Sequence, residues 1–146
     1  MSEETGAAPP PWVLDVSVLT AVARADAGVT GFILNVDAGG RTVVIPALAM
    51  AAASLDVRSA DADQVLRGLE RLPNAMIAPL HGARQAVRLA AVIARTGLDP
   101  WDAHVAAVAD TAVCPIVTLD AAKWREHVNG LDEPLRIIEI ADPDEG

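Results

Sequence analysis

Five short apolar runs, separated by segments with helical periodicity, constrain the fold of this chain more than any other feature. The runs lie at residues 12–15, 42–45, 75–78, 115–118 and 136–140. A short, continuous apolar run bounded by turn residues is typical of a strand buried in a parallel sheet. Strands that alternate with helices predict a sheet covered on both faces. We therefore expect an α/β fold with three α/β/α layers around a mainly parallel sheet, and the last run should lie at the sheet edge.

The segments between the runs have the apolar spacing of amphipathic helices. Gly39 should end the second helix and Gly97 the fifth, whereas Pro46 fits the first turn of the third. Ser17 is expected to cap the first helix, and Asp99 the sixth. The expected helices span residues 16–26, 29–38, 47–55, 61–72, 82–95, 99–111 and 121–128. The fifth should turn an apolar face inward, made of Ala83, Val87, Ala90, Ala91 and Ala94.

The length of 146 residues fits one domain with a substantial core. We expect a disordered N-terminal tail at residues 1–11, one domain at 12–140 and a disordered acidic tail at 141–146. No apolar run reaches the ~18–20 residues that a membrane span needs, and the start of the chain lacks the basic residues of a signal peptide. The single cysteine, Cys114, has no disulfide partner and is expected to be buried in a cytoplasmic protein.

The charge balance argues against one class of function. The chain has 20 acidic and 11 basic residues and a net charge of −9, and five of the acids lie in the two tails. This is not the basic footprint of a nonspecific nucleic-acid-binding domain. A nuclease remains compatible with it, because an acidic cluster that binds metal contributes negative charge of its own.

Three aspartates lie at the ends of predicted elements. Asp15 ends the first strand, Asp102 opens the sixth helix and Asp120 follows the fourth strand. The functional crevice of a parallel sheet lies beyond the carboxyl ends of its strands. Acids gathered there repel one another unless a cation lies between them, and carboxylates suit Mg²⁺ or Mn²⁺. Asp99 either caps its helix or shares in this metal site.

Four stretches make the sequence resemble a known family: VLDVSVL at 13–19, VVIPAL at 43–48, DAHVAAVA at 102–109 and IVTLD at 116–120. Their order and separation resemble the PIN domain, the fold of VapC-type toxin ribonucleases. The resemblance implies an endoribonuclease dependent on Mg²⁺ or Mn²⁺ that cleaves RNA phosphodiester bonds. It also implies a cognate antitoxin and a homodimer as partners.

The resemblance assigns roles to individual residues. Asp15, Asp102 and Asp120 match acidic positions that hold metal and carry catalysis, with Asp99 as an accessory ligand. Ser17 and Thr118 match hydroxyl residues that support the acids by hydrogen bonding.

One position departs from the family pattern. The second acid of the family, a glutamate, aligns with Ala52, so a weakened metal site is expected. Asp56 lies one turn further along the same helix; it is expected to be solvated, with substitution for the glutamate as the alternative. Two functions stay open: a metal-dependent ribonuclease of reduced activity, and an inactive PIN-fold protein that binds a partner or RNA.

Other side chains have simpler explanations. The three histidines share no ligand spacing with one another or with Cys114, which argues against a zinc site. His104 is expected at the core edge or the surface rather than in catalysis, and Trp12 and Trp124 are expected to anchor the core. Trp101 either packs against a helix or stacks on an RNA base. Three arginines form either a solvated helix face or a phosphate contact: Arg84, Arg88 and Arg95.

Overall fold

The computed structural model describes residues 9–127 and 130–140, whose strands form one five-stranded sheet. Every pair of neighbouring strands is parallel, in the order β3-β2-β1-β4-β5. This confirms the predicted parallel sheet, with β5 at one edge. The strands are β1 (Trp12–Leu14), β2 (Val43–Pro46), β3 (Ala75–Ala78), β4 (Ile116–Thr118) and β5 (Ile137–Glu139).

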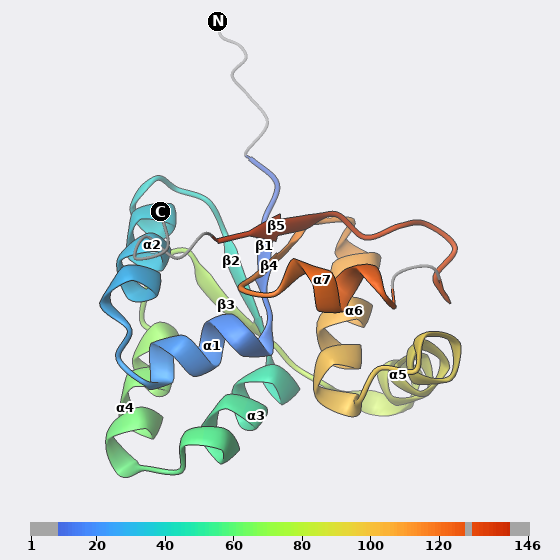
Figure 1. Cartoon of the computed structure of the whole chain (residues 1–146), viewed down its shortest axis with the longest axis horizontal. Helices are drawn as coiled ribbons and strands as arrows, with labels where there is room; N and C mark the ends of the chain where they lie inside the picture. The colour runs from blue at the N-terminus through green and yellow to red at the C-terminus, as the bar shows by residue number, and fades with distance from the viewer. Residues whose placement is uncertain (1–8, 128–129, 141–146) are drawn as a thin grey trace, which may run out of the picture.

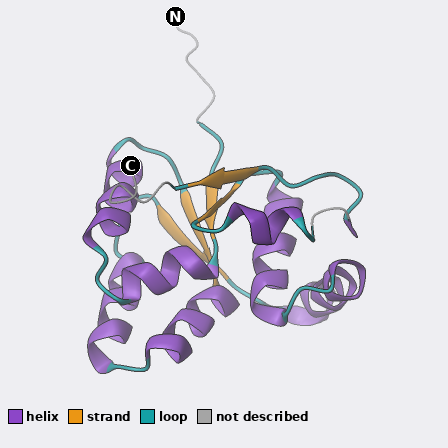
Figure 2. Ribbon diagram, in the orientation of Figure 1, coloured by secondary structure: helices purple, strands orange, loops and turns teal. Residues whose placement is uncertain are grey.

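Seven helices in the described part of the chain cover the sheet and confirm the three-layer α/β/α class. Figure 2 shows the strands running through the middle of the molecule with the helices around them. The predicted helices are all present, with ends shifted by a few residues. They are α1 (Val16–Ala23), α2 (Ala27–Ala38), α3 (Ala47–Val57), α4 (Ala60–Leu69), α5 (Gly82–Thr96), α6 (Pro100–Ala112) and α7 (Ala121–Arg125).

The order of the strands reverses beside β1. From β1 the chain builds β2 and then β3 on one side, and it returns to place β4 and β5 on the other side (Figure 1). Because β1 and β4 are parallel neighbours, with Leu14 opposite Val117, their carboxyl ends reach the same edge of the sheet. Such a reversal leaves a crevice at that edge. Asp15 and Asp120 follow these two strand ends.

The core combines branched aliphatic strands with helices rich in alanine. Every residue of β2 is buried, as expected for a strand covered on both faces. Helix α3 packs against both α1 and α6, and alanines are buried on α3 (Ala49, Ala53) and on α6 (Ala103, Ala106). Small side chains allow helices to approach closely, which brings the helix starts near the crevice together. Cys114 is buried and free, as predicted.

Helices α1 and α3 begin at the predicted residues, but the residues that cap them differ from the prediction. Asp15, rather than Ser17, caps α1, because the helix begins at Val16 and the Asp15 carboxylate accepts the backbone N–H of Val18. Pro46 is the cap residue that precedes α3 rather than part of its first turn, and it has no side-chain acceptor to offer.

The start of α3 finds its acceptor on another helix. The backbone N–H of Leu48 donates to Nδ1 of His104, at 3.2 Å. Burial lowers the pKa of His104, although a hydrogen bond with the backbone of Pro79 opposes this shift. The neutral imidazole therefore keeps the lone pair that Leu48 needs. His104 is buried rather than at the core edge, and its role in this contact is structural.

The predicted inward face of α5 was also wrong. Figure 1 shows α5 beyond α6, away from the sheet. Leu89 and Val92 are its buried residues, whereas Val87 is 69% exposed. The helix has α6 as its main neighbour, so two larger side chains fill the contact. The remaining residues of the predicted face are exposed: Ala83, Ala90, Ala91 and Ala94.

Most of the expected N-terminal tail (1–8) and all of the C-terminal tail (141–146) lie outside the described residues. Among the described helices, none is by itself long and apolar enough to cross a membrane. Helices α1 and α2 satisfy the length and composition criteria only as a pair, and the pair is bent by 113°.

Candidate functional site

Asp15 lies fully buried at the end of β1 and its carboxylate is held by three donors. Oδ1 accepts the hydroxyl of Ser17 at 2.6 Å and the backbone N–H of Val18 at 3.1 Å. Oδ2 accepts the indole N–H of Trp124 at 2.8 Å. A buried carboxylate is costly unless it is hydrogen bonded. These donors therefore fix both the position and the orientation of Asp15.

Ser17 and Thr118 connect the ends of β1 and β4. The Ser17 hydroxyl, besides donating to Asp15, accepts the backbone N–H of Leu119 at 3.0 Å. It lies 3.3 Å from the hydroxyl of Thr118, which in turn accepts the backbone N–H of Asp120 at 3.0 Å. These contacts hold together the two strand ends that carry Asp15 and Asp120.

Asp102 enters the site from the first turn of α6. Its backbone N–H donates to Oδ1 of Asp99, the cap of that helix, at 2.8 Å. The Asp102 side chain is 4% exposed. Its Oδ1 atom is buried and has no hydrogen-bond partner in the described part of the chain. Burial raises the pKa of Asp102, and the charges of Asp99 and Asp15 raise it further against the opposing effect of Lys123.

Lys123 supplies the cation of the site. Its Nζ lies 2.5 Å from Oδ2 of Asp102. Burial would lower the pKa of Lys123, but the hydrogen bond and charge of Asp102 and the charges of Asp15 and Asp99 outweigh it, so the pKa is raised. The ammonium is thus the group that compensates three of the predicted acids at once.

Asp120 has a different role from Asp15 and Asp102. It is exposed and caps α7, where its Oδ1 accepts the backbone N–H of Lys123 at 3.2 Å. Across residues 9–127 and 130–140, no three His, Cys, Asp or Glu side chains form a group that could hold a metal ion. Asp15, Asp99 and Asp102 thus lie near the ammonium of Lys123. Asp120 is exposed and contacts only the backbone of Lys123.

Helix α3 contributes no acid to the site. Ala52, at the family's glutamate position, is partly buried on a helix that packs against both α1 and α6. Asp56 pairs instead with Arg24 at 2.8 Å, and its side chain is 55% exposed. Asp56 is thus a surface residue near the helix end, in agreement with the favoured prediction.

Sequence reasoning missed Lys123 altogether and placed Trp124 only in the core. Trp124 is indeed fully buried, but it also donates to Asp15. Lys123 lies in the last turn of the short helix α7, where the helix dipole already favours a cation, so its local pattern did not indicate a pair with Asp102.

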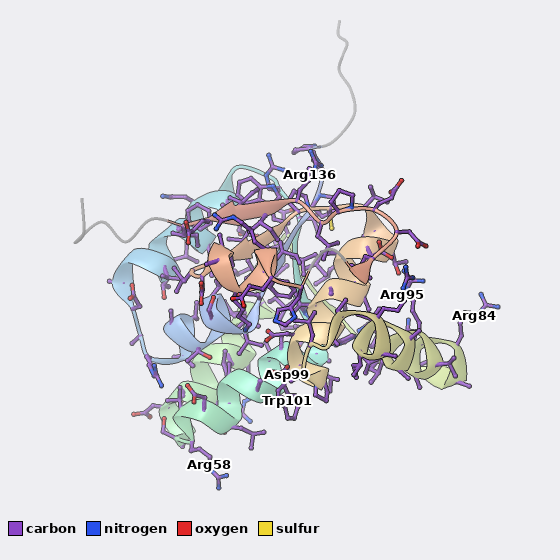
Figure 3. The ribbon with its side chains drawn as sticks, turned by 45° about the vertical axis from the view of Figure 1, so that its right-hand side comes forward. Arg58, Arg84, Arg95, Asp99, Trp101 and Arg136 are labelled. Atoms are coloured by element: carbon purple, nitrogen blue, oxygen red, sulfur yellow. The ribbon has the colours of Figure 1, made fainter. Side chains whose placement is uncertain are left out.

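The remaining candidates are Trp101, beside Asp99, and three arginines of α5. Figure 3 shows Asp99 and Trp101 together at the start of α6, with Arg84 at the far end of α5. Arg88 pairs with Asp110 at 2.5 Å, and Arg95 with Asp132 at 2.6 Å. Two of the three arginines therefore make surface ion pairs.

Two solved structures are similar to this chain in fold. One is described as VapBC2 from Rickettsia felis bound to a DNA fragment from its promoter; its TM-score is 0.62 at 14% identity, covering 89% of this chain and 98% of that one. The other is described as DNA-bound VapBC from Salmonella typhimurium; its TM-score is 0.58 at 15% identity, covering 90% and 98%. Comparison with curated protein sequences gives no match.

The family comparison agrees with the geometry. The model of the PIN domain matches residues 12–127, which include both strand ends, the start of α6 and the whole of α7. That range contains every acid of the candidate site. The chain belongs to the PIN domain family.

Proposed function

We propose that this protein is a VapC-type toxin that cleaves RNA phosphodiester bonds with Mg²⁺ or Mn²⁺, at reduced activity. One observation carries the proposal. Oδ1 of Asp102, at the start of α6, is a buried carboxylate oxygen without a hydrogen-bond partner among the described residues, and the charge of Asp15 acts on the same carboxylate. A buried carboxylate oxygen without a partner is costly even when the other oxygen is ion-paired, and a cation is a ligand that would compensate it.

The carboxylates fit a divalent cation in their chemistry. Hard oxygen donors suit Mg²⁺ and Mn²⁺, which bind through few carboxylates and retain waters. Asp102 would hold the metal through Oδ1, Asp15 through the remaining lone pair of Oδ2, and Asp99 and Asp120 through the oxygens that do not cap helices. When bound, such a metal supplies a nucleophile at neutral pH and stabilises the charge on a phosphodiester. The arrangement around Lys123 must open for this set to assemble.

The protein's own groups would orient this centre. Ser17 and Trp124 fix the Asp15 carboxylate, so its free lone pair keeps one direction. Thr118 binds the backbone of Asp120 and holds the end of β4 beside it. Helix α3 carries alanine at position 52, so one anionic ligand of the family pattern is absent. This absence supports reduced activity rather than a different reaction.

The partners belong to the same proposal. The two similar structures are complexes described as VapBC, and each similar chain is covered over 98% of its length. We infer a cognate antitoxin that silences the toxin, and a homodimer of the toxin itself. Size-exclusion chromatography with light scattering measures the oligomer, and co-expression with the product of a neighbouring gene tests the antitoxin.

RNA cleavage tests the activity directly. Purified protein is incubated with a labelled RNA and Mn²⁺, comparing wild type with Asp102→Asn and Ala52→Glu. We expect weak cleavage by wild type, none by Asp102→Asn and stronger cleavage by Ala52→Glu. Asp110→Asn, on the same helix but in a surface pair with Arg88, is the matched control and should cleave like wild type.

A second candidate function rests on the ammonium in the site. Lys123 already compensates the acids, which favours a PIN-fold protein that binds RNA or a protein without cutting. Under this alternative, wild type and Ala52→Glu bind RNA in a filter assay but leave it intact with Mn²⁺. That outcome would replace the ribonuclease proposal.

A further inference from the structure

Lys123 is the only lysine in the chain, and every other basic residue is an arginine. An ammonium is a compact point charge, whereas a guanidinium is a planar fork suited to paired contacts. A small cation site surrounded by carboxylates therefore accepts lysine more readily than arginine. The single lysine pairs with Asp102, and the charges of Asp15 and Asp99 also act on it.

The short helix α7 brings two groups to the acids. The Nζ atom of Lys123 binds Oδ2 of Asp102 at 2.5 Å, and the indole of the next residue, Trp124, binds Oδ2 of Asp15 at 2.8 Å. The backbone N–H of Lys123 is bonded to Asp120. One turn of helix therefore contacts all three aspartates expected to hold metal.

We propose that Lys123 is the resident counter-ion of this site, and that a divalent metal binds only by displacing its ammonium from Asp102. The proposal rests on the metal site of the proposed function but not on RNA cleavage. The ammonium and a metal ion are alternative occupants, because both need the Asp102 carboxylate and both are positive. Metal occupancy would therefore be set by Lys123 as well as by the missing glutamate at Ala52.

The structure gives the displaced side chain a place to move. Lys123 borders an open hollow of about 530 Å³ beside α1, together with Ser17, Thr20, Asp26 and Asp56. Its side chain is 36% exposed, whereas that of Asp102 is 4% exposed. The ammonium can leave toward solvent and toward Asp26 without disturbing the core, whereas Asp56 is already paired with Arg24.

Metal affinity is the first test. Mn²⁺ binding is measured by calorimetry on full-length wild type, Lys123→Met and Arg125→Met. Removing a positive charge a few ångströms from a divalent ion should raise affinity about ten- to a hundredfold. Arg125→Met, which removes an exposed cation of the same helix, should change affinity less than about twofold. Equal affinities of wild type and Lys123→Met, or no binding by either, would overturn the proposal.

The single lysine allows a second test on the unaltered protein. With ¹⁵N-lysine labelling, one side-chain ammonium signal reports on Lys123. Saturating Mg²⁺ should move this signal to the position it has in Asp102→Asn, where the ion pair is broken. If calorimetry shows Mg²⁺ bound while the signal stays unchanged, Lys123 is not displaced and the proposal fails. This measurement decides the matter if Lys123→Met does not fold, which a thermal melt reveals.

The tests separate this proposal from the ribonuclease proposal. If Lys123→Met binds Mn²⁺ more tightly and no variant cuts RNA, the counter-ion role stands and the ribonuclease fails. If RNA is cut and metal affinity is unaffected by Lys123→Met, the reverse holds. If Lys123→Met lowers RNA affinity and leaves metal affinity unchanged, Lys123 is a phosphate contact and the counter-ion role is overturned.

Discussion

Asp15 shows how one residue can serve both the fold and the site. Its Oδ1 atom caps α1 and its Oδ2 atom accepts from Trp124, so the carboxylate ties β1, α1 and α7 together. A residue committed in this way is held without needing a metal. The hydrogen bonds that stabilise the fold are therefore the same ones that orient the site.

We predict that Trp124→Phe destabilises the protein by about 2–4 kcal/mol, because it removes a donor from a buried carboxylate and leaves a gap in the core. Urea denaturation measures the free energy of unfolding. Trp101→Phe is the control, since Trp101 is only partly buried and no hydrogen bond to its indole is present in the described residues. Similar losses in the two variants would show that the indole–Asp15 bond contributes little.

At the scale of elements, helices α5 and α6 both end in a left-handed backbone conformation. The residue that caps the C-terminus of α5 is Gly97, with a left-handed φ of 75°, and the residue that caps α6 is Val113, with φ 54°. Glycine adopts this conformation without strain, but a β-branched residue does so at a cost. Val113 is 72% exposed, so burial does not repay that cost.

Val113→Gly should therefore raise the free energy of unfolding by about 0.5–1 kcal/mol, since the relief of left-handed strain exceeds the added flexibility of the unfolded chain. Gly97→Ala should lower it by about 1 kcal/mol for the opposite reason. Thermal or urea melts of both variants provide the measurement. A loss of stability in Val113→Gly would mean that the Val113 side chain makes a contact worth more than the strain.

At the scale of the whole molecule, α5 differs from the other long helices. It lies beyond α6, and most of its residues are exposed. Helix α3, by contrast, packs against both α1 and α6 beside the sheet. Regions with little buried apolar contact open at lower free energy.

Hydrogen exchange followed by mass spectrometry should therefore show faster exchange in Gly82–Thr96 than in β1 and β2. Repeating the measurement at low and high protein concentration makes it sensitive to self-association. Protection of α5 that grows with concentration would place the proposed homodimer contact on this helix. If α5 is protected as strongly as β2 at every concentration, the prediction that α5 opens at lower free energy is contradicted.

The sequence alone determined much of this protein. Short, continuous apolar runs indicated buried parallel strands. Gly97 and Asp99 marked helix ends, because glycine adopts the left-handed conformation that follows a helix and aspartate accepts a free backbone N–H at its start. The same patterns placed Asp15 and Asp120 at strand ends and Asp102 in a first helical turn. These are local properties of the chain, and local stereochemistry governs them.

Only the tertiary structure decided what those residues contact. Asp15, Asp102 and Lys123 are far apart along the chain, and their meeting depends on the return of the chain from β3 to β4 on the other side of β1. The exposed face of α5 likewise depends on having α6 as its main neighbour. Periodicity shows which residues share a face, but neighbouring elements determine which face is buried and which cation a carboxylate meets.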